Sequence, residues 1–200
     1  WGKKVYDMIK AGNETDAFNA WLAAMQALEN PFKGDDKMAK TAWNYITAMA
    51  EKYNEPGRFT AFIGYEWTSL DAGRNLHRNV VLRDNGDRAS RVEPMVTQGP
   101  TGSTDPLDLY KWLENYEAET GGSVFALAHN GNLSNGIMFP VDKQFTGREI
   151  DKSYVEQRAR WEPLYEITQI KGDGEAHPAL SPDDEFADYE NWDVGNLDLS

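Results

Sequence analysis

Three histidines, and one glutamate within an apolar segment, are the side chains of this sequence best suited to chemistry. The histidines are His77, His129 and His177, and the chain has no others. His129 directly follows the apolar segment SVFALA, His177 comes shortly after LYEITQI, and Glu66 lies within FIGYEWTS. Because loops at the ends of strands build the active sites of α/β folds, we expect several of these groups to converge. Imidazoles together with one carboxylate are a ligand set for a Lewis-acid metal ion.

Glu66 has two explanations that the sequence leaves open. It lies between Tyr65 and Trp67, and a carboxylate in so apolar a segment is costly to bury without a partner. It therefore either pairs with Arg74 or Arg78 as a structural ion pair, or it binds a metal ion. Each histidine taken alone has a similar alternative, as an ordinary core or surface residue whose hydrogen bonds are satisfied.

The composition of the chain excludes several kinds of site and partner. The 200 residues include no cysteine, which excludes disulfides, thiolate metal sites and cysteine nucleophiles and leaves both periplasm and cytoplasm open as compartments. A divalent transition metal held by imidazole and carboxylate would be zinc, manganese or iron. The net charge of −13 argues against nucleic-acid binding, which needs a basic surface. No apolar run approaches the roughly 20 residues that span a bilayer, so we expect no membrane span in this segment.

Apolar periodicity predicts the elements that would position these residues. It predicts amphipathic helices over 14–29 and 36–53, and the second has a face that we expect to be buried: Met38, Ala42, Tyr45, Ile46 and Met49. Short apolar segments between turn residues predict strands over 59–67, 76–83, 123–128 and 164–170. A charged helix is expected near 150–160. Another is expected to begin at Thr104 or Asp105, with Pro106 in its first turn, and to end at Gly121.

Strands separated by helices favour an α/β fold with parallel pairing. We interpret the chain as a single domain overall. Within it, residues 1–56 would form a helical insertion or lid, and residues 57–200 would carry the α/β part and the chemistry.

Four sequence blocks resemble a known bacterial family. They are FIGYEWTS, HRNVVLR, ALAHNGNLSNGIMF and EPLYEITQIKGDGEAHP, and they span roughly residues 59–195. In this order they resemble the family called domain of unknown function 3604, which is itself similar to the PHP (polymerase and histidinol phosphatase) metallohydrolases. The resemblance implies that residues 57–200 form part of a distorted (β/α)7 PHP-like barrel. It also implies that Glu66 bridges metal ions, that His77 and His129 ligate them, and that a metal-activated water hydrolyses a phosphoester, with Glu66 and His129 as catalytic residues.

The sequence departs from the PHP pattern in its missing motifs. The family opens with a His-x-His motif and an Asp-His pair and closes with an Asp-x-His motif, and this chain has none of them. It begins at Trp1 without an initiator methionine and stops at Ser200 in a polar stretch. We therefore expect an interior fragment, inactive alone, whose missing ligands lie outside it; a degenerate relative is the alternative.

Five further residues are expected around the metal ligands. Arg78, Asn130 and Lys171 are predicted to bind a small-molecule substrate, which the resemblance implies is phosphorylated. Glu175 and His177 are predicted to form an outer pair that supports the ligands. The alternatives are ordinary surface pairing for Arg78 and Lys171 and turn formation for Asn130, which precedes a glycine.

The leading hypothesis is thus a metal-dependent hydrolase, which requires Glu66, His77 and His129 to converge around one point. The main alternative is a non-catalytic carbohydrate- or protein-binding module, which predicts exposed aromatic rings in a row and Glu66 paired to an arginine. A third is a calcium-stabilised domain that uses the acidic stretch 172–200, which holds nine acids and no Lys or Arg.

Overall fold

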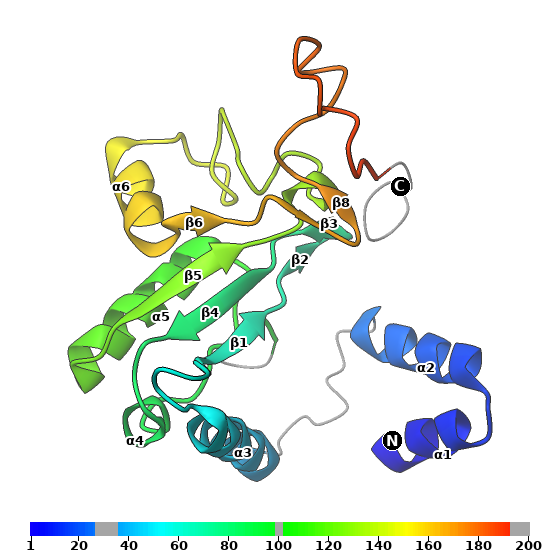
Figure 1. Cartoon of the computed structure of the whole chain (residues 1–200), viewed down its shortest axis with the longest axis vertical. Coiled ribbons are helices and arrows are strands. Elements are labelled where there is room, and N and C mark those ends of the chain that lie inside the picture. The colour runs from blue at the N-terminus through cyan, green and yellow to red at the C-terminus, as the bar shows by residue number, and fades with distance from the viewer. Residues whose placement is uncertain (27–35, 99–101, 193–200) are drawn as a thin grey trace.

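The computed structural model describes residues 1–26, 36–98 and 102–192 and places a small mixed sheet at the centre of the fold (Figure 1). The sheet has the order β1-β4-β5-β6, formed by β1 (Ile63–Trp67), β4 (Arg78–Leu82), β5 (Val124–Ala128) and β6 (Leu164–Tyr165). β1 and β4 run antiparallel, as do β4 and β5, whereas β5 and β6 are parallel. The mixed α/β class is confirmed, but the expected parallel pairing is wrong except between β5 and β6.

The connection between β1 and β4 is too short for parallel pairing. Residues 68–77 fold into a second, two-stranded ladder of β2 (Leu70–Asp71) and β3 (Arg74–Asn75). Its turn uses left-handed backbone at Ala72 (φ 48°) and Gly73 (φ 78°). A parallel crossover needs a dozen or more residues, so a chain that returns this soon pairs antiparallel.

A long loop explains why β5 also runs antiparallel to β4, although a helix lies between them. The loop after β4 first carries the chain to the opposite end of the sheet, where Ser69 Oγ donates to the carbonyl of Thr104 (2.9 Å). α5 (Pro106–Thr120) then returns along the sheet, and the Arg83 N–H donates to the Ser123 carbonyl (3.0 Å) where β5 begins. The chain therefore crosses the sheet twice, and β5 starts beside the end of β4.

A single helical crossover, by contrast, makes β6 parallel to β5. α6 (Lys152–Trp161) provides this crossover. The chain then forms a small ladder of β7 (Thr168–Gln169) and β8 (Gly172–Asp173), so the expected strand over 164–170 is divided. Within the described residues the four-stranded sheet is open, with β1 and β6 at its edges, and closes into no barrel.

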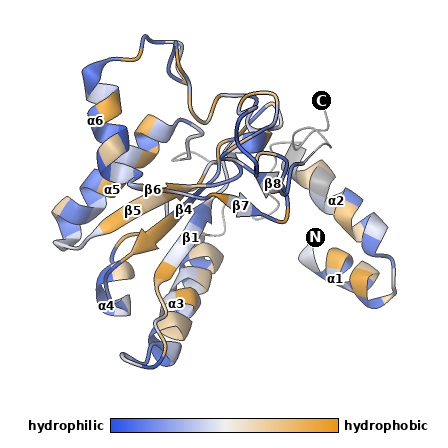
Figure 2. Ribbon diagram, turned by 45° about the horizontal axis from the view of Figure 1, so that its top comes forward, coloured by the Kyte–Doolittle hydropathy of each residue, from blue (hydrophilic) through white to orange (hydrophobic). Residues whose placement is uncertain are grey.

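The sheet and α5 enclose the main core. Asp105 caps α5 by accepting from the Leu107 N–H (2.9 Å), and left-handed Gly121 (φ 63°) ends it, so this expected helix is confirmed. β4 and β5 are strongly hydrophobic ribbons in Figure 2. The large buried side chains of the core are Ile63, Trp67, Val80, Leu82, Leu109, Tyr110, Leu113, Tyr116 and Trp161.

α3 (Asp36–Tyr53) joins this core through a different face from the one expected. Trp43 is buried, and its Nε1 donates to the last carbonyl of α4 (Gly86–Ala89), 3.1 Å away. Tyr45 and Ile46 are exposed. The expected face is wrong because periodicity alone does not show where the Trp43 indole finds both apolar neighbours and a hydrogen-bond acceptor.

α1 (Gly2–Lys10) and α2 (Glu14–Gln26) pack against each other and lie away from the sheet (Figure 1). The sequence did not predict α1. α2 confirms the helix expected over 14–29 as far as Gln26, and residues 27–29 lie outside the described residues. Phe18 and Trp21 are exposed, with ring centroids 5.9 Å apart. No helix in the described parts of the chain is both long and apolar enough to cross a membrane.

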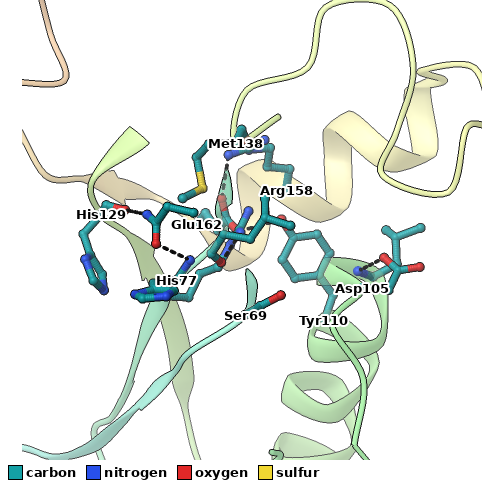
Figure 3. A network of polar contacts seen from close by, with 12 residues as sticks. Ser69, His77, Asp105, Tyr110, His129, Met138, Arg158 and Glu162 are labelled. Carbon is teal, nitrogen blue, oxygen red and sulfur yellow. Dashed lines mark hydrogen bonds and ion pairs between the residues drawn. The ribbon is translucent and has the colours of Figure 1, made fainter. Parts of the chain in front are cut away.

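A buried ion network joins β4 to α5 and α6 (Figure 3). The Arg78 side chain is 1% exposed, and its Nε lies 2.8 Å from Glu162 Oε1. Glu162 also accepts from the Tyr110 hydroxyl (2.7 Å) and lies 2.9 Å from Arg158. Burial would raise the pKa of Glu162, but the two guanidinium groups outweigh it and hold that pKa below its usual value. The negative charge of Glu162 in this buried position is therefore stabilised by Arg78 and Arg158.

Removing Glu162 should destabilise the fold, because two guanidinium groups would lose their shared partner in a buried position. We expect Glu162→Ala to lower the free energy of unfolding by about 3–5 kcal/mol in urea denaturation. The control is Glu156→Ala, which removes an exposed pair with Lys152 on α6 and should cost less than about 1 kcal/mol. Equal losses in the two variants would contradict this role for the network.

Candidate metal centre

Three adjacent strands bring Glu66, His77 and His129 to one end of the sheet. Glu66 lies in β1 opposite Asn79 of β4, so it is diagonal to His77, which immediately precedes β4. Arg78 pairs with Ala128 in the β4–β5 ladder, and the next pair along is His77 with His129, whose N–H donates to the His77 carbonyl (3.4 Å). Neighbouring strands thus fix the spacing of all three side chains.

The ligand atoms of these three residues form a compact cluster. One from each residue lies within 4.8 Å of the others. His77 Nδ1 is 3.3 Å from Glu66 Oε1, and His129 Nε2 is 3.5 Å from Glu66 Oε2. The two imidazole rings lie side by side with centroids 5.6 Å apart (Figure 3). This is the only group of three or more such side chains that could hold a metal ion in the described residues.

The cluster favours an ionised carboxylate. The pKa of Glu66 is lowered to about 2, chiefly by the adjacent His129 imidazole, and also by the Thr68 hydroxyl (2.7 Å) and the nearby His77. Partial burial acts in the opposite direction. With this pKa Glu66 is anionic at neutral pH, and its side chain remains 40% exposed to solvent.

His77 is held in its neutral form. Burial lowers its pKa to about 4, and the nearby charges of His129, Lys171 and Arg78 act in the same direction, whereas Glu66 opposes them. A neutral imidazole keeps a nitrogen lone pair available for a metal ion. The side chain is 15% exposed. Solvent therefore does little to stabilise its protonated form.

Two buried imidazole nitrogens in the cluster lack a hydrogen-bond partner. These are Nε2 of His77 and Nε2 of His129. The 3.5 Å approach of His129 Nε2 to Glu66 is at the outer limit for a hydrogen bond. The His77 nitrogen that faces Glu66 is Nδ1, whereas the unsatisfied nitrogen of His129 is the one beside the carboxylate. Buried polar atoms are normally satisfied, so this unsatisfied His129 Nε2 beside an anionic carboxylate fits a site built for a cation.

The predicted substrate-binding residues lie in three different settings. Arg78 is buried and engaged by Glu162 in the ion network. Asn130 is 3% exposed, and its Nδ2 has no hydrogen-bond partner. Lys171 is partly exposed, and its ammonium is close enough to His77 to lower the pKa of that imidazole. Asn130 and Lys171 therefore adjoin the cluster, while Arg78 lies within the fold below it.

Glu175 and His177, the predicted outer pair, do not join the cluster. Both are exposed. The His177 Nδ1 accepts from the Ala179 N–H (3.2 Å), and the Glu175 N–H donates to Asp173 (2.6 Å). The described part of the acidic stretch, 172–192, contributes no group of carboxylates with metal-ligand spacing.

Several neighbours of the cluster were not predicted from the sequence. Thr68 donates to Glu66, and the buried Asn75 donates to the carbonyls of both His129 and Asn130. Glu166 accepts from the Asn130 N–H (2.9 Å). For Thr68 the signal was available, because residues two apart on an extended chain lie on one face. Asn75 and Glu166 act on main-chain groups far away in the sequence, which no local pattern shows.

A family model described as "Protein of unknown function (DUF3604)" matches residues 3–200. The chain belongs to this family. The match extends beyond the four sequence blocks and includes α2, α3 and all of α1 except its first residue. No curated protein and no solved structure matches the chain. Membership in DUF3604 names no activity, so a function must be argued from the site itself.

The depressed pKa of His77 predicts a pH-dependent stability in the metal-free chain. Between pH 6.5 and about 4 the unfolded state binds a proton at His77 that the folded state does not, so stability should fall as the pH drops through this range. Below pH 4.5, Glu66 adds a dependence of the same sign. Urea unfolding at several pH values with a chelator present measures the slope.

The matched variants are His77→Gln and His177→Gln. His77→Gln should flatten the pH dependence of the free energy of unfolding between pH 4 and 6.5. His177→Gln, which changes an exposed histidine, should leave that pH dependence as in the wild type. An unchanged slope in His77→Gln would show that His77 is not buried in the neutral form.

Proposed function

We propose that Glu66, His77 and His129 bind a divalent transition metal ion, zinc, manganese or iron, and that this chain supplies part of a hydrolase centre. The observation that carries the proposal is the convergence of the three side chains from three strands, with two buried imidazole nitrogens left unsatisfied. Two neutral nitrogen donors and one carboxylate oxygen suit these metals.

The surroundings of the cluster suit catalysis better than a closed structural site. Three protein ligands leave coordination positions open, and the exposed side of Glu66 gives water and substrate a way in. When bound, such an ion would lower the pKa of a coordinated water toward neutrality and polarise a substrate oxygen. The chain needs no side-chain nucleophile for hydrolysis of this kind.

We assign metal binding, proton acceptance and substrate binding to different residues of the chain. Glu66 supplies the anionic oxygen, which Thr68 orients by donating its hydroxyl (2.7 Å), and it is the candidate to accept a proton from the attacking water. His77 and His129 would hold the ion through imidazole nitrogens. Lys171 and the unsatisfied Nδ2 of Asn130 can bind the oxygens of an anionic substrate.

The resemblance of the four sequence blocks, through DUF3604, to the PHP metallohydrolases motivates a finer proposal about the substrate and the whole site. We propose that the substrate is a small phosphorylated molecule. The open sheet would then be part of a larger barrel, whose remaining ligands come from outside these residues. On this proposal the chain alone binds metal but does not turn over substrate.

The geometry disfavours the alternative of a non-catalytic binding module. That alternative requires Glu66 to pair with an arginine, yet Glu66 lies against the two histidines. Arg78 pairs with Glu162, and Arg74 pairs with Asp71. Phe18 and Trp21 are exposed neighbours, but α2 carries them away from the cluster.

Calorimetric titration of the chelator-treated chain with Zn²⁺ tests the proposal. We expect the wild type to bind zinc and the double variant Glu66→Ala, His129→Ala to lose more than about 100-fold in affinity, since two of three ligands are gone. The matched control is Glu175→Ala, His177→Ala, which removes an exposed glutamate and histidine outside the cluster and should bind as the wild type does. No zinc binding by the wild type, or equal affinity in both double variants, would overturn the metal centre.

A further inference from the structure

We propose that Asn75 and Glu166 are positioning residues that hold the peptide between His129 and Asn130 from both sides. Through that peptide they fix the His129 imidazole against Glu66 and His77. The inference rests on the metal centre proposed above and assigns a task to two residues that the sequence does not point to.

Asn75 holds the carbonyl side. It is fully buried, and its Nδ2 donates to the carbonyl of His129 (2.7 Å) and to that of Asn130 (3.0 Å). Its Oδ1 accepts from the N–H of His77 at the longer distance of 3.4 Å. Only a carboxamide offers two N–H donors and an acceptor at once, so Asn75 is chemically matched to this position. One side chain thereby contacts the backbone of both histidines.

Glu166 holds the amide side of the same peptide. Its Oε2 accepts from the Asn130 N–H (2.9 Å), and Gln169 Nε2 donates to both of its carboxylate oxygens (3.1 and 3.2 Å). The next N–H, that of Gly131, donates to the hydroxyl of Tyr165 (3.1 Å). Two successive N–H groups after His129 are therefore bound by side chains at the end of β6.

This peptide needs side-chain partners because the β-ladder stops before it. β5 ends at Ala128, and beyond it the 3.4 Å contact between the His129 N–H and the His77 carbonyl is long. Asn130 adopts left-handed backbone (φ 52°, ψ 45°), a conformation that most residues avoid but that asparagine accepts more readily than other side-chain-bearing residues. The chain must turn sharply directly after a candidate ligand, and Asn75 and Glu166 replace the strand bonds that would otherwise hold it.

A positioning role changes the orientation of a ligand and the affinity for metal, whereas a general contribution to stability changes only the free energy of unfolding. Partners behind metal ligands set ligand orientation, and their loss typically costs about 10–100-fold in metal affinity. In Asn75→Asp a carboxylate faces two carbonyls with no donor. Glu166→Leu leaves the Asn130 N–H without an acceptor, whereas Glu166→Gln keeps an acceptor oxygen there. If Asn75→Asp does not fold, the comparison of Glu166→Leu with Glu166→Gln still tests the positioning role.

Two measurements on the full chain test the proposal. The first is the nuclear Overhauser effect between the ring protons of His77 and His129 without metal, and the second is Zn²⁺ affinity by calorimetry. We expect Asn75→Asp and Glu166→Leu to lose the ring contact and to bind zinc about 10–100-fold more weakly. Glu166→Gln should retain the contact and restore affinity to within about threefold of the wild type.

Asn191→Asp is the matched control. Its carboxamide also donates to two main-chain carbonyls, those of Ala187 and Tyr189, but to no part of the cluster. This variant should keep both the ring contact and the affinity. The proposal is overturned if Asn75→Asp or Glu166→Leu folds and still shows the wild-type ring contact, or if Glu166→Gln behaves like Glu166→Leu.

The ring contact separates this inference from the metal centre. If the wild-type chain binds no zinc, yet its ring contact disappears in Asn75→Asp and Glu166→Leu, the metal centre fails and the positioning role stands. If the wild type binds zinc and the folded variants bind it equally well with the ring contact intact, the metal centre stands and the positioning role fails.

Discussion

The register of the antiparallel ladder between β4 and β5 is the constraint on which the rest of this structure depends. Pairing of Arg78 with Ala128 makes His77 and His129 the next neighbours along the two strands. Because side chains alternate across a sheet, a slip of one residue would turn one of the two imidazoles to the opposite face. The core side chains that hold this register, such as Val80 and Ala126, therefore position the candidate ligands as well.

Beyond the end of this ladder, polar side chains hold the backbone in place of strand-to-strand hydrogen bonds. Directly below the cluster, Arg78 is fixed by Glu162, which binds the start of β4 to the end of α6. Directly beyond it, Asn75 and Glu166 bind the backbone that leaves β5. The cluster thus lies between a buried ion network and a partly buried group of side chains that bind the backbone, and the exposed side of Glu66 faces solvent. Rigid surroundings with one open side are what a binding or catalytic centre requires.

The sequence predicted the features that depend on local chemistry. Asp105 and Gly121 mark the ends of α5, and apolar segments mark the positions of β1, β4 and β5. The candidate ligands were predictable because histidine is rare in this chain and a glutamate in an apolar strand is unusual. The antiparallel pairing of β1 and β4 could have been predicted from their short connection. The direction of β5 could not, because it depends on a loop that crosses the sheet before α5 begins. The roles of Asn75 and Glu166 could not be predicted either, because their hydrogen-bond partners lie 36 to 55 residues away along the chain.

On our proposal, three neighbouring strands create one metal site from Glu66, His77 and His129. Anomalous diffraction at the zinc absorption edge, from crystals of the chain grown with Zn²⁺, tests it most directly because it locates the ion without assuming its ligands. We expect an anomalous peak at about 2.0–2.2 Å from an imidazole nitrogen of each histidine and from a Glu66 carboxylate oxygen. Zinc bound elsewhere, with this cluster empty in the same crystals, would contradict it.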